Sequence, residues 1–171
     1  MTATAATEMQ AAGLAWRRAA LDASGASAAA GIVSAHLDRD GSKLGHRSSV
    51  ARYGYDYTHE ASWLRDIPEP FLDLARRLDL DSNSVTLNRY EARDYLDAHI
   101  DLDCFDMVSV LNLGATCNFT LYPPGEPSTI LALGIGDCIT MTDEVLRTWK
   151  HSVWSTYLRY SVVFRRRQPA Q

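Results

Sequence analysis

The chain has 171 residues, of which 46% are hydrophobic and 22% are charged, and its net charge at pH 7 is −4. This length suits one domain with a hydrophobic core, and the composition is ordinary for a globular protein. The acidic balance argues against broad contact with nucleic-acid phosphates, but it does not exclude a local basic groove.

The sequence carries no feature of a membrane or secreted protein. No stretch approaches the roughly 20 apolar residues of a membrane span, and the N-terminal segment lacks a basic region and carries Glu8, unlike a signal peptide. The cysteines at 104, 117 and 138 are odd in number and lack metal-binding spacing, which favours small buried thiols over a disulfide. We expect a cytoplasmic protein, and nothing indicates an obligate protein partner.

The N-terminal part of the chain predicts helices and a loop. The Ala-rich stretch 7–22 predicts one helix, and residues 26–36 predict a second, short one. Residues 38–49 are polar and contain two glycines, which predicts a loop.

Tyrosines alternate with other residues over 53–57, and this period of two predicts a strand with Tyr53, Tyr55 and Tyr57 on one face. Two interpretations stay open. The tyrosines pack on neighbouring strands of a half-buried sheet, or they form a stacking surface for a flat substrate. After Pro68, apolar residues recur at helical spacing from Phe71 to Leu78 and predict a helix.

The remainder of the chain predicts many short strands with few helices between them. The segment 142–148 predicts a short polar or helical link. This pattern is typical of a mainly β protein with flanking helices, and we expect an antiparallel jelly roll, also called a double-stranded β-helix, in a single domain. Within it, residues 1–50 are expected to form a helical buttress and loop, and residues 51–167 the jelly-roll core. The predicted strands are 85–90, 107–113, 117–122, 129–133, 138–141 and 157–165.

A His-Ile-Asp motif indicates a metal site. Side chains two apart on a strand share a face, so His99 and Asp101 can reach one point while Ile100 turns away. An imidazole with a carboxylate suits a divalent transition metal. The best third ligand is His151, the only histidine downstream, although taken alone it is better explained as a surface or core residue. Two histidines and one carboxylate make a facial triad with three open coordination positions.

A second motif near the C-terminus indicates an anion site. Read as a strand, residues 159–165 place Arg159, Ser161 and Arg165 on one face. Two arginines on an interior face are costly unless anions meet them, and a dicarboxylate would supply two. The alternative is a ladder of salt bridges on an edge strand. Upstream, Asn88 and Tyr90 also share a strand face.

The order of these motifs along the chain resembles that of the AlkB-like Fe(II)/2-oxoglutarate dioxygenases. The motifs are Asn-Arg-Tyr, then His-x-Asp, then a distal His, and then two Arg six residues apart. The resemblance runs from about Tyr53 to Arg165. It implies Fe(II) held by His99, Asp101 and His151, with 2-oxoglutarate and O2 as co-substrates.

The resemblance also implies how 2-oxoglutarate is held. Arg159 with Tyr90 would bind its C5 carboxylate, and Arg165 with Asn88 would lie near the C1 carboxylate that chelates iron. Family members often have Asn two residues after the first arginine. This chain has Ser161 there, a shorter donor.

The reaction that the resemblance implies is hydroxylation of a C–H bond, coupled to decarboxylation of 2-oxoglutarate. The substrate is either an alkylated nucleobase, demethylated oxidatively, or a small molecule of a biosynthetic pathway. The tyrosine-rich strand favours the nucleobase. The acidic balance and the lack of a basic, aromatic-rich segment before Tyr53 favour the small molecule. We lean slightly to the nucleobase. A catalytically inactive binding module would need a broken triad or anchor set, and none is broken here.

Overall fold

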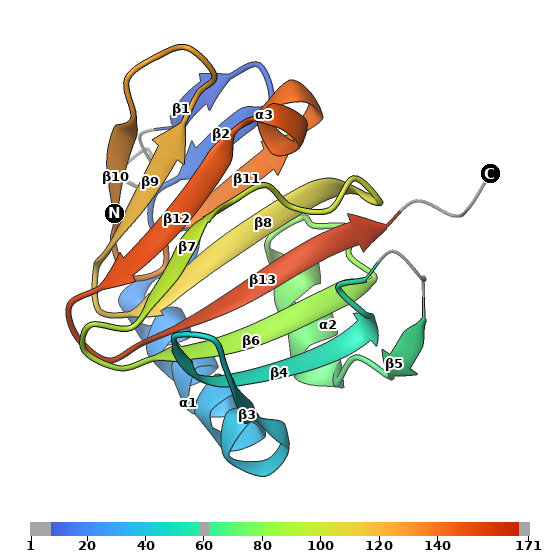
Figure 1. Ribbon diagram of the computed structural model, residues 1–171. Coiled ribbons are helices and arrows are strands. Elements are labelled where there is room, and N and C mark those ends of the chain that lie inside the picture. The colour runs from blue at the N-terminus through green and yellow to red at the C-terminus, as the bar shows by residue number, and fades with distance from the viewer. Residues whose placement is uncertain (1–7, 59–61, 168–171) are drawn as a thin grey trace, which may run out of the picture.

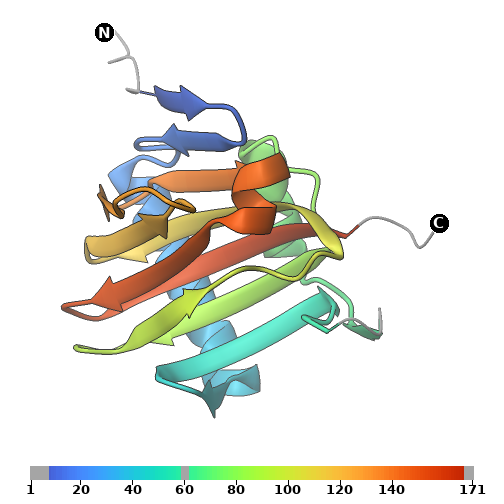
Figure 2. The ribbon, with the colours of Figure 1, turned by 45° about the horizontal axis from the view of Figure 1, so that its top comes forward.

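The computed structural model describes residues 8–58 and 62–167 (Figure 1). In this part of the chain two antiparallel sheets face each other, and two helices cover the outer face of the larger sheet (Figures 1 and 2). This arrangement confirms the predicted double-stranded β-helix. None of the described helices is long and apolar enough to cross a membrane.

The larger sheet has the strand order β1-β2-β11-β8-β13-β6-β4-β3, with β5 paired to β4. Its strands are β1 (Glu8–Ala11), β2 (Leu14–Arg17), β3 (Ser42–Leu44), β4 (Arg47–Tyr55), β5 (Trp63–Arg65), β6 (Ser84–Tyr90), β8 (Phe105–Gly114), β11 (Cys138–Thr142) and β13 (Arg159–Arg167). The smaller sheet has the order β10-β9-β12-β7. Its strands are β7 (Tyr95–His99), β9 (Cys117–Tyr122), β10 (Thr129–Leu133) and β12 (Lys150–Ser155).

The helices are α1 (Ala23–Asp40), α2 (Glu69–Arg77) and α3 (Asp143–Thr148). Asp22 caps α1, because its side chain accepts a hydrogen bond of 2.7 Å from the backbone N–H of Gly25. The buried residues of α1 are three or four positions apart and pack on β8, β4, β6 and β13. They are Ala26, Ala29, Val33 and Leu37.

Two apolar clusters fill the two layers. One lies between the helices and the larger sheet, and it includes Val162 and Phe164 of β13. The other lies between the two sheets, and it includes Val163 and Phe119. The alternation along β13 therefore places its polar set, Arg159, Ser161 and Arg165, toward the smaller sheet, as the sequence predicts. The inter-sheet layer is where the candidate site forms.

The predicted helix over 7–22 is wrong for the described residues of that stretch, and Thr7 lies outside them. The structure has the hairpin β1–β2 there, and β2 pairs with β11. Leu14 and Trp16, two positions apart, are buried in the inter-sheet cluster. Pairing with β11 and burial on one face override the helical propensity of the alanines.

The predicted loop over 38–49 is also wrong. Helix α1 continues to Asp40, beyond the predicted 26–36, and β3 and β4 then form a hairpin. Gly41 ends the helix in an extended conformation, and its N–H donates to the carbonyl of Leu37. The short β3 is exposed, so it shows no apolar pattern from which a strand could be predicted. The division of the chain at residue 50 stays a prediction.

Candidate metal and co-substrate site

The structure brings the three predicted metal ligands together between the sheets. His99 ends β7, Asp101 follows two residues later, and His151 lies on β12 directly opposite His99. One ligand atom from each of the three residues lies within 4.8 Å of those from the other two. Antiparallel pairing of β7 with β12 thus unites residues that are far apart in the sequence.

The charge state of this cluster suits metal binding. Burial tends to raise the pKa of Asp101, but the nearby imidazole of His151 and the charge of Arg165 outweigh it and hold that pKa below its usual range. Burial and the neighbouring His151 lower the pKa of His99. An ionised carboxylate beside a neutral imidazole is the form that ligates a metal.

One hydrogen bond of His99 indicates which ring nitrogen is free to bind a metal. Its Nδ1 lies 2.8 Å from the carbonyl oxygen of Asp97. A carbonyl only accepts, so Nδ1 carries the proton and Nε2 keeps a free lone pair. A histidine held in this way is oriented as a metal ligand.

Asp101 supplies the observation that tests whether a metal fits. Its Oδ2 is buried and has no hydrogen-bond partner in the described part of the chain, although Nε2 of His151 lies 3.3 Å away. An orphaned carboxylate oxygen in the interior is costly. A divalent cation between this oxygen and the two imidazoles would satisfy it, and two histidines with one carboxylate suit Fe(II).

Arg159 provides a similar test for an anion. It is fully buried, its Nε donates to Oδ1 of Asn112 at 2.8 Å, and its guanidinium carbon lies 4.5 Å from the centre of the Tyr90 ring. Its Nη1 is buried and has no hydrogen-bond partner among the described residues. None of the described carboxylates forms a salt bridge with Arg159. A buried guanidinium of this kind fits the carboxylate of a bound ligand.

Arg165 lies differently from the expectation that places it with Asn88. Its Nε is 3.4 Å from Oδ1 of Asp101, and its Nη1 donates to Oγ1 of Thr86 at 2.9 Å. Asn88 instead donates from Nδ2 to Oγ of Ser161 at 3.1 Å. Arg165 therefore holds the carboxylate of a candidate metal ligand, and its role toward a co-substrate stays a prediction.

All eight predicted metal and co-substrate residues line one cavity, with a volume of about 30 Å³. They are Asn88, Tyr90, His99, Asp101, His151, Arg159, Ser161 and Arg165. Two neighbours escaped sequence analysis. Arg47 lines the cavity from a stretch predicted to be a loop, and Asn112, which orients Arg159, lies in an apolar strand where no signal marks it. Phe119 stacks on His151, with ring centres 5.5 Å apart.

The three tyrosines do not share one face, contrary to the sequence-based prediction. Gly54 has φ +74°, and the pairing of β4 with β5 shifts register between Gly54 and Tyr55, so the alternation is broken. Tyr53 is buried in the cluster beneath the helices, and its hydroxyl donates to Asp40. Tyr55 contacts Trp63 edge-on at 5.1 Å.

Of the three, only Tyr57 lies beside the candidate site. Its ring centre is 4.6 Å from the guanidinium carbon of Arg165, and it stacks on Phe105 at 5.8 Å. Burial and the negative charge of Asp101 raise the pKa of its hydroxyl. Tyr57 thus stays a candidate for substrate contact, whereas Tyr53 lies in the helix-side core.

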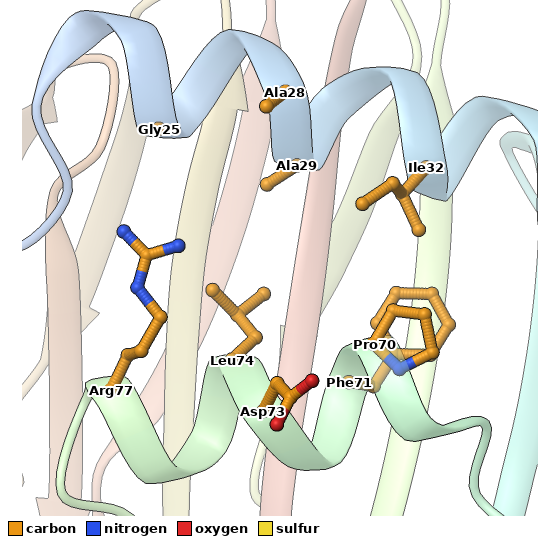
Figure 3. Close-up of a pocket in the computed structure, with 9 residues that line it drawn as sticks. All are labelled: Gly25, Ala28, Ala29, Ile32, Pro70, Phe71, Asp73, Leu74 and Arg77. Atoms are coloured by element: carbon orange, nitrogen blue, oxygen red, sulfur yellow. The ribbon is translucent and has the colours of Figure 1, made fainter.

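A larger hollow of about 350 Å³ lies elsewhere, between α1 and α2 (Figure 3). Ile32 of α1 and Phe71, Leu74 and Arg77 of α2 line it. These helices cover the face of the larger sheet that points away from the smaller one (Figures 1 and 2). The hollow is therefore separated from His99, Asp101 and His151 by the sheet.

Comparison with known proteins locates the fold. No protein-family model matches the sequence, and a search of curated proteins finds no match either. Among solved structures, OsALKBH1 is similar with a TM-score of 0.72 and 15% identity, over 90% of this chain and 98% of that one. A Pseudomonas putida prolyl-4-hydroxylase gives 0.68 and 14%, over 92% and 94%. An oxidoreductase of the 2OG-Fe(II) oxygenase family from Burkholderia pseudomallei gives 0.65 and 19%, over 90% and 84%.

These similarities show the fold, which is that of the solved 2OG-Fe(II) oxygenases. Within this fold, the chain brings together the His-x-Asp pair, His99 and Asp101, and the distal His151. The similarity to OsALKBH1 and that to the prolyl-4-hydroxylase are comparable, so they do not separate an AlkB-like protein from other proteins of this fold.

Proposed function

We propose that this protein is an Fe(II)/2-oxoglutarate-dependent dioxygenase that hydroxylates a C–H bond. One observation carries the proposal. The buried, unpartnered Oδ2 of Asp101 lies with His99 and His151 in a cavity that also contains the unpartnered Nη1 of Arg159. A divalent cation and a carboxylate are the two groups that would satisfy these atoms.

The residues of the cavity would divide the work as follows. His99, Asp101 and His151 hold Fe(II), and Arg159 with Tyr90 binds the distal carboxylate of 2-oxoglutarate. When bound, Fe(II) and 2-oxoglutarate supply O2 activation coupled to decarboxylation, which yields succinate, CO2 and a hydroxylated product.

The surrounding residues would orient the ligands and exclude water. Arg165 pairs with Oδ1 of the Asp101 carboxylate, whereas His151 lies near Oδ2. Phe119 stacks on the His151 ring, so one face of that ligand is shielded by an apolar group. Rigid support of this kind keeps ligand geometry constant while co-substrates exchange.

For the substrate, we infer oxidative demethylation of an alkylated nucleobase, and a biosynthetic small molecule is the alternative. The AlkB-like order of motifs supports the first. The net charge of −4 supports the second, as does the position of Tyr53 away from the cavity. Of the three tyrosines, only Tyr57 lies near enough to the cavity to be a candidate for stacking on a flat base.

The first test is metal and co-substrate binding. The metal-free protein is titrated with Fe(II) without oxygen, and then with 2-oxoglutarate, by calorimetry. We expect one tight metal site that is lost in His99→Ala and Asp101→Ala. His36→Ala is the matched control, because His36 lies on α1 and packs on Phe71, on the far side of the larger sheet. Equal metal binding by all variants would refute the proposal.

The second test is turnover. Succinate formed from 2-oxoglutarate in air is measured with methylated oligonucleotides, with methylated nucleosides and without substrate. Stimulation by one class that requires His99 supports the dioxygenase and selects the substrate class. Steep loss of that stimulation with added salt identifies a polyanion, whereas salt-independent turnover identifies a small molecule. Succinate formation that persists unchanged in His99→Ala would contradict the assignment.

A further inference from the structure

Arg47 enters the candidate co-substrate cavity from the start of β4. Its Nη1 donates to Oδ1 of Asn88 at 2.9 Å, and Nδ2 of Asn88 lies 3.1 Å from Oγ of Ser161. Asn88 and Ser161 are paired across β6 and β13, and each side chain is buried. Three side chains from three adjacent strands thus form one hydrogen-bonded chain along the cavity wall.

The donors in this chain fix its direction. A guanidinium has donors only, so the Asn88 atom that faces Arg47 must be the amide oxygen. The amide nitrogen then faces Ser161, and because this nitrogen also only donates, Oγ of Ser161 must accept. The hydroxyl proton of Ser161 is therefore left to donate elsewhere. No acceptor for it is found in the part of the chain that the structure describes.

The charge of Arg47 is likewise uncompensated. No carboxylate among the described residues forms a salt bridge with it, and its Nε is buried without a hydrogen-bond partner. Burial lowers the pKa of Arg47, and Arg52 and Arg165 lower it further. Arg159 and Arg165 line the same cavity. Three guanidinium groups against the single carboxylate of Asp101 indicate that the cavity is built for an anion.

We propose that Arg47 is a positioning residue of the 2-oxoglutarate site. It fixes the amide of Asn88 so that the hydroxyl of Ser161 donates to a carboxylate of the bound diacid, and its own charge attracts the same ligand. This inference rests on the proposed function. The AlkB-like pattern often has Asn where this chain has Ser161. The inference gives the serine a role, because Arg47 acts through Asn88 to set the direction in which the Ser161 hydroxyl donates.

The test measures binding of 2-oxoglutarate to the Mn(II)-loaded protein by calorimetry, which requires no knowledge of the substrate. Arg47→Met removes the donor and the charge. We expect the Kd for 2-oxoglutarate to rise at least about tenfold, with the Kd for Mn(II) unchanged. Arg47→Lys is expected to stay within a few fold of the wild type, because lysine also has donors only and keeps the amide of Asn88 in place.

Arg52→Met is the matched control. Arg52 lies on the same strand, and removing it takes away a nearby positive charge, but its bond is to Asp56 at 3.1 Å and not to Asn88. A purely long-range electrostatic effect would weaken 2-oxoglutarate binding in Arg52→Met as well as in Arg47→Met. We expect binding by Arg52→Met to match the wild type.

Two further variants separate positioning from general structural support. Ser161→Ala should weaken 2-oxoglutarate binding, and the double variant Arg47→Met/Ser161→Ala should be weakened by less than the product of the two single effects. Asn88→Asp would accept from both Arg47 and Ser161 and draw the hydroxyl proton away from the ligand. It should weaken binding with Arg47 intact, and it keeps the proposal testable if Arg47→Met does not fold.

The outcomes distinguish this inference from the function on which it rests. If the wild type binds Mn(II) and 2-oxoglutarate and Arg47→Met binds both equally well, Arg47 has no positioning role and the proposed function stands. If the double variant raises the Kd for 2-oxoglutarate by the full product of the two single effects, Arg47 does not act through Ser161, and the inference is also overturned. A wild type that binds neither metal nor 2-oxoglutarate would overturn both proposals.

Discussion

Arg165 and Asp101 form an ion pair in the interior of the protein, with Nε of the arginine 3.4 Å from Oδ1 of the aspartate. The side chains are 10% and 1% exposed. The other carboxylate oxygen, Oδ2, faces His151. One carboxylate thus links β13 of the larger sheet to the candidate metal ligands, so the stability of the fold and the geometry of the site depend on the same contact.

Arg165→Met should destabilise the metal-free protein strongly. Removing one partner of a buried ion pair leaves the other charge without compensation, which costs about 3–5 kcal/mol. The free energy of unfolding is measured in urea with a chelator present. The control is Arg166→Met, because Arg166 is 41% exposed and its pairs with Asp106 and Asp81 contribute less than about 1 kcal/mol. Equal losses in the two variants would show that Arg165 is not the compensating charge.

Gly54→Ala should also destabilise the fold, because of backbone geometry at the break in the tyrosine alternation. Gly54 has φ +74°, and a Cβ there would lie 2.2 Å from the carbonyl oxygen of Asn83. Left-handed strain alone costs about 1–2 kcal/mol, and the contact with Asn83 adds to it. Gly31→Ala is the opposite case, since Gly31 lies inside α1 and a Cβ there meets nothing within 4 Å.

We expect Gly31→Ala to raise the free energy of unfolding by about 0.5–1 kcal/mol, because alanine is the better helix former. Thermal and urea unfolding of the two variants give the comparison. A neutral or stabilising effect of Gly54→Ala would contradict the geometry of the β4–β5 connection.

Tyr53→Phe should make the protein less stable near pH 7 by about 1 kcal/mol, because the hydroxyl of Tyr53 donates to Asp40 at 2.7 Å. Hydrogen bonds from Arg39 and from Tyr53 hold the pKa of Asp40 below its usual range. Burial and the bond to Asp40 raise the pKa of Tyr53 to about 12.

The sign of the pH dependence follows from the lowered pKa of Asp40. Its stabilising contribution is present above the unfolded-state pKa of about 3.9 and is lost as the pH falls through the folded-state value. Because the unfolded-state pKa is common to the wild type and Tyr53→Phe, the difference between them should persist at pH 4 and shrink only as the pH falls further, through the folded-state pKa of Asp40. Tyr160→Phe is the control, since the Tyr160 hydroxyl donates to the neutral Ser34 at 3.2 Å and its loss should not depend on pH. Urea unfolding at pH 7, 4 and 2 checks both variants.

Asp137→Ala should release the β1–β2 hairpin from the rest of the sheet. The carboxylate of Asp137 accepts hydrogen bonds from the Trp16 indole and from the backbone N–H groups of Ala19 and Gly134. Losing the acceptor leaves these partly buried donors unpaired, which should cost at least about 2 kcal/mol.

Amide hydrogen exchange over residues 8–17 reports this release directly, and exchange in β13 should change less. Asp73→Ala on the exposed face of α2 is the matched control and should change stability by no more than about 0.5 kcal/mol. Unchanged protection of the hairpin in Asp137→Ala would rule out the carboxylate as its anchor.

The sequence by itself determined the β-rich fold and indicated eight of the residues that line the candidate site. Period-two alternation over β13 separates Val162 and Phe164 from Arg159 and Arg165, and the structure keeps that separation. The bounds of β9 and β10, Cys117–Tyr122 and Thr129–Leu133, match the predicted 117–122 and 129–133, because turn-forming residues frame these strands. These features are local, so a short window of sequence contains the physics that decides them.

Only the tertiary structure decided which residues meet. The pairing of β2 with β11 turned an alanine-rich stretch into a hairpin, and the break at Gly54 separated Tyr53, in the helix-side cluster, from Tyr57 beside the candidate site. Arg47 reached the cavity, and Asn112 reached the buried Arg159, from positions with no local signal. Strand pairing and the burial of charge act between residues that are distant in the chain, so their outcome depends on neighbours that periodicity within one segment does not reveal.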